Sequence, residues 1–567
     1  MVVLGVIVFA LQAWRAVSAL RQAENLATSL TNSIVSGDAR AARAYLDQFD
    51  EETTKAHHAT DGPIWWLGSK VPYLGRNIAA LRVVAAQADA VADQALPGVV
   101  DVADRVQLET FRPKNGRVDL AAVSRALPAL TSAHRVMARA DAEIAAIDVD
   151  GLLPVLRQPV GEVQVKVHET ASATTAAFEA GRLMPSMLGG DGRTRRYLML
   201  VLNNAEVRSL VGMPGSVAVI KARKGKVAMG QQGGIHDLPQ LTKAAVPIKA
   251  ESEGGFSTTV GADIRDTTSV PTFPRAAELS AAVVGERWEE KYDGVVAVDP
   301  VALSYVLGGV GSVDVGDGIT LNEGNAAAML LNGVYLKYPT DFNRQDDVFE
   351  LAARRTFDAL TSGRGNSVLA IRALVRGVQE GRIMLWSRDA DEQGRIRRTG
   401  ISGEWSMDRR TPEVGFFVND SGSTKMEYYL RMRSNLRSVR CWDKGVETLD
   451  LTAILRSEAM PGVPLPESVT GLGTFVPRGV MGLHAMILAP PGGEVRTLRV
   501  DGVRAPVGAT IYRGRHIVRV SQLLSPGETS VLKAEIETAP SPHDAAVLRT
   551  TPGVVANDDT VDTRACS

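Results

Sequence analysis

Apolar residues recur at three- and four-residue spacing through the first part of the chain. This spacing predicts amphipathic helices, because residues three and four apart share one face of a helix. The apolar face of the first helix consists of Ala16, Leu20, Ala23, Ala27, Leu30 and Ile34. Gly37 and Asp38 break that helix, and the same spacing predicts later helices over 39–59, 78–95, 121–147 and 156–181. The pattern indicates a helical stalk or bundle over residues 15–190.

The stretch Arg195–Gly234 has a different pattern. Tyr197–Leu202 is a nearly continuous apolar run, as expected of a strand that is buried on both faces. Gly212, Pro214 and Gly215 mark a turn, Ser216–Ile220 reads as a second strand, and Lys221–Lys226 is a basic hairpin tip. Polar residues stand between the first strand and the turn, namely Asn203, Asn204, Glu206 and Arg208. Ligands bind beyond the carboxyl ends of strands in open α/β sheets, so these residues form a candidate site. The alternative is an ordinary sheet edge whose polar groups satisfy the backbone.

Strand and helix patterns alternate over residues 191–390, which is typical of an α/β domain. From about residue 394 the apolar positions take a period of two between Pro and Gly turns, which predicts a β-sandwich-like domain over 391–540. The polar tail, 541–567, is expected to be loosely ordered. The predicted fold class is therefore multidomain α+β, with a helical stalk, a central α/β domain and a C-terminal β-sandwich-like domain.

The first segment, Met1–Trp14, is almost wholly apolar. It is shorter than the roughly 20 residues that a spanning helix needs, but the helix that follows could prolong it. Arg15 and Arg21 follow the apolar run, whereas a cleaved signal peptide has its basic residues before it. We expect residues 1–14 to be the truncated remains of one membrane anchor; the alternative is a buried core helix.

A second aromatic segment, Gly62–Asn77, reads GPIWWLGSKVPYLGRN. Two Trp, one Tyr and two Pro in so short a stretch are compatible with two arrangements. One is a corner packed on the helices, and the other is an aromatic belt at a membrane interface, where Trp and Tyr are enriched.

Composition narrows the classes of function. The 567 residues exceed what one hydrophobic core holds. The formal net charge of −1 gives no support for nucleic-acid binding. Only two cysteines are present, Cys441 and Cys566, which excludes a cysteine-based zinc module. They could form a disulfide in an oxidising compartment or remain free thiols.

Motifs of the common nucleotide-binding and hydrolytic sites are absent from the chain. Acids and arginines at expected loop positions remain, namely Glu206, Arg208, Asp263, Arg265, Asp266, Arg275, Asp341, Arg344 and Asp346. Arginine binds phosphate oxygens in a bidentate manner, and Mg²⁺ prefers carboxylates together with substrate phosphates. The set suits a phosphate or pyrophosphate held with Mg²⁺, and the alternative for each member is a surface ion pair.

Four stretches resemble a known family. They read GPIWWLGSKVPYLGRN, RYLMLVLNNAEVRS, EKYDGVVAVDPVAL and VNDSGSTKMEYYLRM. They are similar to an actinobacterial envelope family, the domain of unknown function numbered four thousand and twelve. The chain departs from that family's pattern after NNAEVR, where SLVGMPGS replaces a Thr-Gly-Gly-Phe type of segment.

Two further stretches, YVLGGVGSVDV and LNEGNAAAMLLNGVYLKYPTDFNRQDD, more distantly resemble the LytR-CpsA-Psr cell-wall ligases. Those enzymes transfer glycopolymers from a polyprenyl-pyrophosphate carrier to peptidoglycan with Mg²⁺ and arginines. Asp341, Arg344 and Gln345 match the family's Asp-x-x-Arg-Gln run. The two arginines that precede this run in the family are replaced here, at Leu336 or Lys337 and at Tyr338.

The resemblance implies a membrane-anchored, single-pass envelope protein with most of its chain outside the cytoplasm. Its expected partners are membrane lipid and a polyprenyl-linked glycan or other envelope proteins, and an oligomer is possible. As a phosphotransferase, it would use Glu206, Arg208, Asp341 and Arg344 in catalysis, with Glu206 and Asp266 on Mg²⁺. Substrate would be bound by Asn203, Asn204, Arg275 and Gln345. The alternative is a non-catalytic envelope scaffold, or a glycan- or partner-binding protein, that keeps the fold without the chemistry.

Overall fold

A computed structural model describes residues 2–36, 38–105, 113–249, 253–508 and 510–566 of the chain. The chain forms two compact units. The helical unit comprises residues 1–193 and 223–226, and the mixed unit comprises residues 194–222 and 227–567. We describe each by itself.

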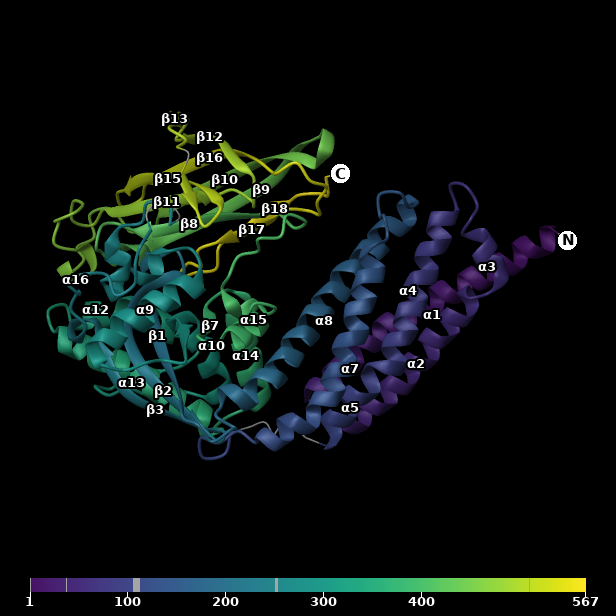
Figure 1. Cartoon of the computed structure of the whole chain (residues 1–567), viewed down its shortest axis with the longest axis horizontal. Coiled ribbons are helices and arrows are strands. Elements are labelled where there is room, and N and C mark those ends of the chain that lie inside the picture. Colours follow the sequence, from purple (N-terminus) through teal and green to yellow (C-terminus); the bar gives the residue numbers. More distant parts are fainter. Residues whose placement is uncertain (1, 37, 106–112, 250–252, 509, 567) are drawn as a thin grey trace. The chain divides into compact units, whose positions relative to one another are not determined.

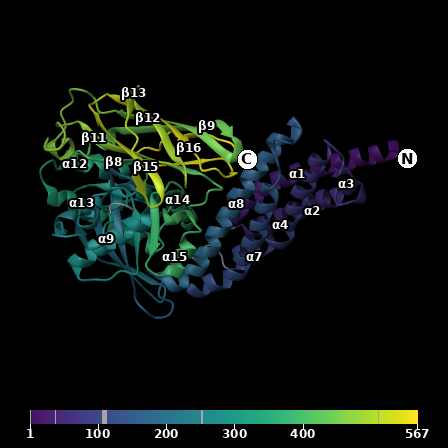
Figure 2. The same ribbon diagram turned by 45° about the horizontal axis from the view of Figure 1, so that its top comes forward.

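The helical unit is built from long helices that run side by side (Figures 1 and 2). The helices are α1 Val2–Ser36, α2 Ala39–Thr60, α3 Pro63–Gly68, α4 Gly75–Gln94, α5 Leu96–Arg105, α7 Leu120–Ala145 and α8 Pro154–Met187. Asp38 caps α2 by accepting a hydrogen bond from the backbone N–H of Ala41, and Asp119 caps α7 in the same way. Small buried residues such as Ala19, Ala56 and Ala85 let the helices approach closely. The helical periodicity of the sequence therefore predicts this unit correctly.

The expected membrane anchor is not represented by a spanning helix. Among the helices that the structure describes, none combines the length and the apolar character needed to cross a bilayer. Most side chains of residues 1–14 lie outside the described residues, and the backbone of this segment forms the beginning of α1.

The tip of one hairpin, residues 223–226, belongs to the helical unit. The N–H of Lys224 donates to the carbonyl of Gly189, and the N–H of Gly225 donates to that of Leu188. The carbonyl of Gly225 accepts from Val118, and Gly225 has a φ of 78°, a conformation that favours glycine. The basic tip predicted at Lys221–Lys226 is thus a turn that is held by helix ends.

The mixed unit begins with a five-stranded sheet of order β3-β2-β1-β4-β7. The strands are β1 Arg195–Arg208, β2 Val211–Arg223, β3 Lys226–Gly234, β4 Gly294–Val298 and β7 Ile383–Ser387. β1 is parallel to β4 and antiparallel to β2, so the sheet is mixed. The principal helices around it are α9 Phe273–Trp288, α10 Pro300–Val310, α13 Phe342–Thr361, α14 Ser367–Gln379 and α15 Ala390–Ile396. Leu198 and Leu200 of β1 pack with Phe273 and Leu279 of α9 in one hydrophobic core.

Short elements connect these parts. They are the 3₁₀ turns Ile235–Asp237, Thr258–Gly261 and Ile264–Ser269, the small hairpin β5 Val313–Asp314 and β6 Thr320–Leu321, and the succession α11 Ala326–Ala328, a π turn Met329–Gly333 and α12 Val334–Lys337. A π turn therefore separates the two short helical segments α11 and α12.

The first strand corrects the sequence prediction in one important respect. β1 does not end at Leu202 but continues to Arg208, with irregular pairing to β2 between Asn203 and Val207. The polar residues expected on a loop are therefore strand residues, and they are buried. Polar groups tolerate burial when other groups pair with them, and such partners come from distant parts of the chain.

Two further sheets form the β-sandwich, with orders β13-β12-β16-β10-β9-β18 and β14-β15-β11-β8-β17. The strands of the first sheet are β9 Leu430–Trp442, β10 Val446–Ser457, β12 Glu494–Val500, β13 Val503–Ala505, β16 Thr529–Glu537 and β18 Thr560–Asp562. Those of the second are β8 Glu413–Asp420, β11 Met481–Leu488, β14 Thr510–Tyr512, β15 Arg515–Leu524 and β17 Val547–Thr550. Phe416 and Ile487 of the second sheet share a core with Leu451 and Ile536 of the first. The predicted sandwich is present, and residues 426–429, which precede β9, form a 3₁₀ turn.

The C-terminal tail is ordered, contrary to the prediction. β17 pairs in parallel with β8, and β18 pairs in parallel with β9, so the tail adds one strand to each sheet. A disulfide joins Cys441 of β9 to Cys566, with their Cα atoms 5.6 Å apart. Of the two alternatives for the cysteines, the structure contains the bonded pair. Strand pairing and a covalent link fix a segment whose polar composition alone suggests a loose chain.

Candidate functional site

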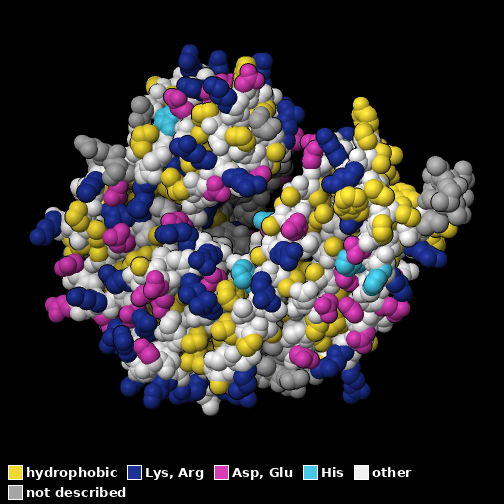
Figure 3. Space-filling model, turned by 45° about the vertical axis from the view of Figure 1, so that its right-hand side comes forward, with side chains coloured by type: hydrophobic (Ala, Val, Ile, Leu, Met, Phe, Trp, Pro, Cys, Tyr) yellow, Lys and Arg dark blue, Asp and Glu magenta, His cyan; other side chains and the backbone are white. Residues whose placement is uncertain are grey.

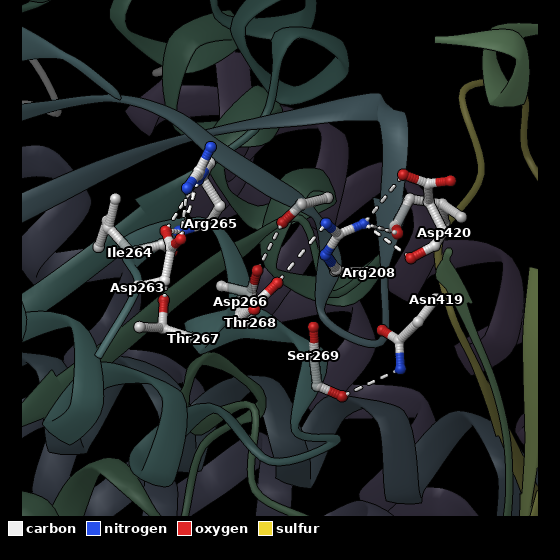
Figure 4. Close-up of polar contacts among 12 residues, drawn as sticks. Arg208, Asp263, Ile264, Arg265, Asp266, Thr267, Thr268, Ser269, Asn419 and Asp420 are labelled. Atoms are coloured by element: carbon white, nitrogen blue, oxygen red, sulfur yellow. Dashed lines mark hydrogen bonds and ion pairs between the residues drawn. The ribbon is translucent and has the colours of Figure 1, made fainter. Parts of the chain in front are cut away.

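The buried half of β1 meets the end of β8 and the 3₁₀ turn Ile264–Ser269, and Arg208 lies between them (Figure 4). Its Nη1 atom donates to the carbonyl of Val207 at 3.1 Å, to the carbonyl of Asp420 at 3.3 Å and to Oδ2 of Asp420 at 3.4 Å. Its Nη2 atom is 3.9 Å from Oδ1 of Asp266. The side chain of Arg208 is only 9% exposed, so the carboxylates of Asp420 and Asp266 are its charge partners in place of water.

Glu206 faces a second cation in the same region. Its Oε1 atom accepts from Nδ2 of Asn203 at 3.1 Å and is 3.1 Å from Nζ of Lys425. Asn203 also donates to the hydroxyl of Tyr335 at 2.9 Å. The ammonium of Lys425 lies 4.8 Å from the centre of the Tyr335 ring, a cation–π contact. Asn203 and Glu206 are thus held by side chains from two other segments.

The neighbouring Glu427 completes a group that we call the buried carboxylate cluster: Glu206, Asp420 and Glu427, with the cations Arg208 and Lys425. Glu427 is 2% exposed, and its carboxylate oxygens are each 3.5 Å from the hydroxyl of Thr424. Burial raises the pKa of Glu427 well above its usual range, and the charges of Asp420 and Glu206 raise it further. Burial also raises the pKa of Asp420, although Arg208 opposes that change. Because Glu427 is buried, forms no ion pair with a cation in the part of the chain that the structure describes and lies near two other carboxylates, it is the group of this cluster that best fits a protonated carboxyl.

A separate buried network contains Asn204. Its Nδ2 atom donates to Oδ2 of Asp299 at 2.6 Å, and Nη1 of Arg382 donates to the same oxygen at 2.6 Å. The other oxygen of Asp299 caps α10 by accepting from the N–H of Ala302. Arg382 is 2% exposed and also donates to the carbonyl of Gly553 at 2.9 Å. Asn204 therefore supports a structural ion pair that joins β4, β7 and the C-terminal segment.

The residues that match the Asp-x-x-Arg-Gln run lie at the start of α13. Asp341 caps this helix by accepting from the backbone N–H of Arg344. Nη1 of Arg344 pairs with Oδ2 of Asp317 at 3.1 Å, and the Arg344 side chain is 52% exposed. Gln345 is buried, and its Nε2 atom donates to the carbonyl of Tyr338 at 2.7 Å. Within the described ranges, no hydrogen bond or ion pair joins these three residues to Glu206 or Arg208.

Arg275, a predicted substrate-binding residue, is engaged inside the protein. Its guanidinium donates to both carboxylate oxygens of Glu253, at 3.2 and 2.7 Å, to Glu278 at 2.7 Å and to the carbonyl of Pro247 at 3.0 Å. The side chain is 6% exposed. These contacts tie α9 to the segment that precedes it.

The two predicted Mg²⁺ ligands each face a different cation. Glu206 is paired with Lys425, and Asp266 faces Arg208. In the part of the chain that the structure describes, no three His, Cys, Asp or Glu side chains gather in a way that could hold a metal ion. Because Glu206 and Asp266 are each engaged with a different cation, their carboxylates do not form a ready Mg²⁺ site.

Sequence reasoning missed Asp420, Lys425 and Glu427, three charged residues of the buried carboxylate cluster. All three lie in the stretch NDSGSTKMEYY, which is part of one of the four segments that carry the family resemblance. The available signal was the density of polar and charged residues in this stretch. The missing information was that this turn folds against β1.

Comparisons with known proteins support one of the two resemblances. Residues 192–335 match the model of a family described as "Protein of unknown function (DUF4012)". This match supports the resemblance to that domain of unknown function over residues 192–335, a region that includes β1 and Tyr335. The match does not extend to the LytR-CpsA-Psr ligases, for which the resemblance stays a prediction.

No curated protein matches the chain. Among solved structures, the chain is similar to protein gbs0355 from Streptococcus agalactiae, with 12% identity and a TM-score of 0.25. That alignment covers 38% of this chain and 76% of the other.

Proposed function

We propose that this protein is a non-catalytic, extracytoplasmic envelope protein whose mixed unit serves as a scaffold or binds a partner or glycan. The pairing of its arginines carries the proposal. Arg208 and Arg275 are buried against carboxylates, and Arg344 is paired with Asp317. A pyrophosphate clamp needs guanidinium groups that are free to meet phosphate oxygens. Displacing a buried carboxylate partner would leave an uncompensated buried charge, which costs about 3–5 kcal/mol.

The disulfide supports a location outside the cytosol. Disulfides persist in oxidising compartments and are rare where thiols are kept reduced. The Cys441–Cys566 bond closes a loop of 125 residues and joins the C-terminus to β9. This arrangement suits a domain that works on the outer side of the membrane, next to lipid and other envelope proteins.

Transfer of a polyprenyl-pyrophosphate-linked glycopolymer is the second candidate, and the position of Arg344 favours it. Arg344 lies in the first turn of α13, where backbone N–H groups attract an anion. Its ion pair with Asp317 is half exposed, and such pairs contribute only about 0–1 kcal/mol, so a phosphate could displace the carboxylate. In that case, the catalytic roles predicted for Glu206, Arg208 and Asp341 would be carried out from the positions that these residues hold in this structure.

Binding of a labelled polyprenyl pyrophosphate in detergent micelles distinguishes the two candidates. The assay compares the full chain with Arg344→Ala, with and without Mg²⁺. Arg478→Ala is the matched control, because Arg478 is also an exposed arginine in an ion pair, with Glu467.

The scaffold proposal predicts that Arg344→Ala and Arg478→Ala retain as much labelled lipid as the full chain does, with or without Mg²⁺. Saturable binding that is lost in Arg344→Ala and kept in Arg478→Ala would overturn it in favour of the ligase-like function. Saturable binding that neither substitution changes would remove the role assigned to Arg344 but retain a glycan-carrier-binding scaffold.

A further inference from the structure

One end of the helical unit exposes a dense group of apolar side chains, which we call the bundle-end patch. It consists of Ile64, Trp66, Leu67, Val71, Tyr73 and Leu74. Tyr73 is 94% exposed, Leu67 60% and Trp66 55%. Figure 3 shows that hydrophobic side chains gather on the helical part of the molecule. Six large apolar residues exposed within eleven positions are unusual, because soluble surfaces rarely concentrate such groups without a partner.

The local structure holds these side chains outward. Trp65, next to Trp66 in the short helix α3, is fully buried. Its ring lies 4.7 Å from that of Phe9, and its Nε1 atom donates to Oε1 of Gln12 at 3.1 Å. Because α3 is fixed to α1 in this way, Trp66 must face away from the bundle. Tyr73 has a φ of 65°, which is uncommon for a residue with a Cβ atom. The packing of Trp65 therefore keeps its neighbour Trp66 on the outside of the bundle.

Neighbouring segments extend the apolar surface. Leu11 and Trp14 of α1 flank Gln12 and are 54% and 70% exposed. They share one face of α1, since they are three residues apart. The contacts of Trp65 with Phe9 and Gln12 hold the segment that bears the patch against the same helix, α1.

The composition of the patch fits a lipid headgroup layer better than a protein partner. Trp and Tyr are enriched where membranes meet water, because each ring has an apolar body and a polar edge. Lys70, between the aromatic residues, has its ammonium 6.0 Å from the Trp66 ring and can reach phosphate while its stem stays among lipid chains. Arg76 is paired with Asp148 at 3.5 Å and adds little net charge.

We infer that this end of the helical unit docks on a phospholipid bilayer by inserting the bundle-end patch into the headgroup layer. This contact does not require a spanning helix, because shallow burial of an apolar face is enough to hold a protein at an interface. Since the local charges largely balance, insertion of apolar and aromatic groups is the main attraction. The inference rests on the proposed envelope location and not on any role of the mixed unit.

The test measures how the full chain partitions onto phosphatidylcholine vesicles by cosedimentation. The test variant is Trp66→Ser with Leu67→Ser. The matched control is Leu472→Ser with Phe475→Ser, since these two apolar residues are each 70% exposed but lie in the mixed unit. Circular dichroism verifies that all three proteins keep their helices.

We expect the wild-type chain to bind, with quenching of tryptophan fluorescence by brominated lipid. The test variant should bind about tenfold more weakly or worse, because it removes two large apolar groups from the inserted surface. The control should bind as the wild type does, and added anionic lipid or high salt should change binding little.

Three outcomes would overturn the inference. In one, the wild type does not bind. In another, the test variant binds as well as the wild type does, so that the N-terminal stretch alone carries membrane affinity. In the third, lipid-free wild type forms a concentration-dependent dimer that the test variant abolishes, so that the patch is an interface between copies. The vesicles contain no polyprenyl lipid, so none of these results bears on the glycan-carrier experiment.

Discussion

Replacing Glu427 with glutamine tests whether the buried carboxylate cluster holds a proton. Glutamine keeps the shape of a protonated carboxyl but cannot ionise. Burial, reinforced by Asp420 and Glu206, raises the pKa of Glu427 well above its value in an unfolded chain. Between those two pKa values the folded state holds a proton that the unfolded state has lost, so the contribution of Glu427 to the free energy of unfolding falls as the pH rises.

The size of the effect follows from one proton. Within that window, the free energy of unfolding of the wild type should fall by up to about 1.4 kcal/mol per pH unit relative to Glu427→Gln. The stability that this proton contributes is fully present at pH values below about 4.5, and it is lost as the pH rises toward the raised pKa of Glu427 in the folded state. For a folding unit of this size, the corresponding difference in Tm is about 2 °C per pH unit.

Thermal unfolding monitored by circular dichroism from pH 5 to pH 9 measures this difference. Glu535→Gln, which changes an exposed acid on β16, is the control and should follow the wild-type curve. Infrared difference spectra should also lose the band of a protonated carboxylic acid in Glu427→Gln. Parallel stability curves for wild type and Glu427→Gln would refute the reasoning. If only Asp420→Asn flattens the curve, the proton resides on Asp420 instead.

Three other outcomes are expected. Replacing both Cys441 and Cys566 with alanine should lower stability by about 2–5 kcal/mol, because the disulfide closes a long loop, and reductant should mimic the change in a thermal melt. Arg382→Met should lower the free energy of unfolding in urea by about 3–5 kcal/mol, because it leaves Asp299 buried without its cation. A loss below about 1 kcal/mol would mean that water or another donor replaces the guanidinium. Arg344→Ala should cost less than about 1 kcal/mol in the same assay, because its ion pair is half exposed, and a larger loss would reveal a structural role.

The candidate site was harder to predict than the fold. The sequence identifies Glu206 and Arg208 as unusual charges after an apolar run, and the structure places both in the buried half of β1. It does not reveal that Arg208 pairs with Asp420, a residue 212 positions away. Arg344, grouped with Glu206 by its chemistry, pairs instead with Asp317. A loop position and a buried strand position can carry the same residue types, and only their neighbours distinguish them.

The sequence by itself determined the helical unit, the apolar start of β1, the hairpin tip and the period-two strands of the sandwich. These features depend on interactions between residues that are close in the chain, which periodicity records. The tertiary structure decided that β1 continues to Arg208, that the polar tail adds a strand to each sheet, and which cation balances each buried acid. The physical reason is that a buried charge is stabilised by whatever group the fold brings within a few ångströms, and the distance between two residues along the chain does not determine their distance in space.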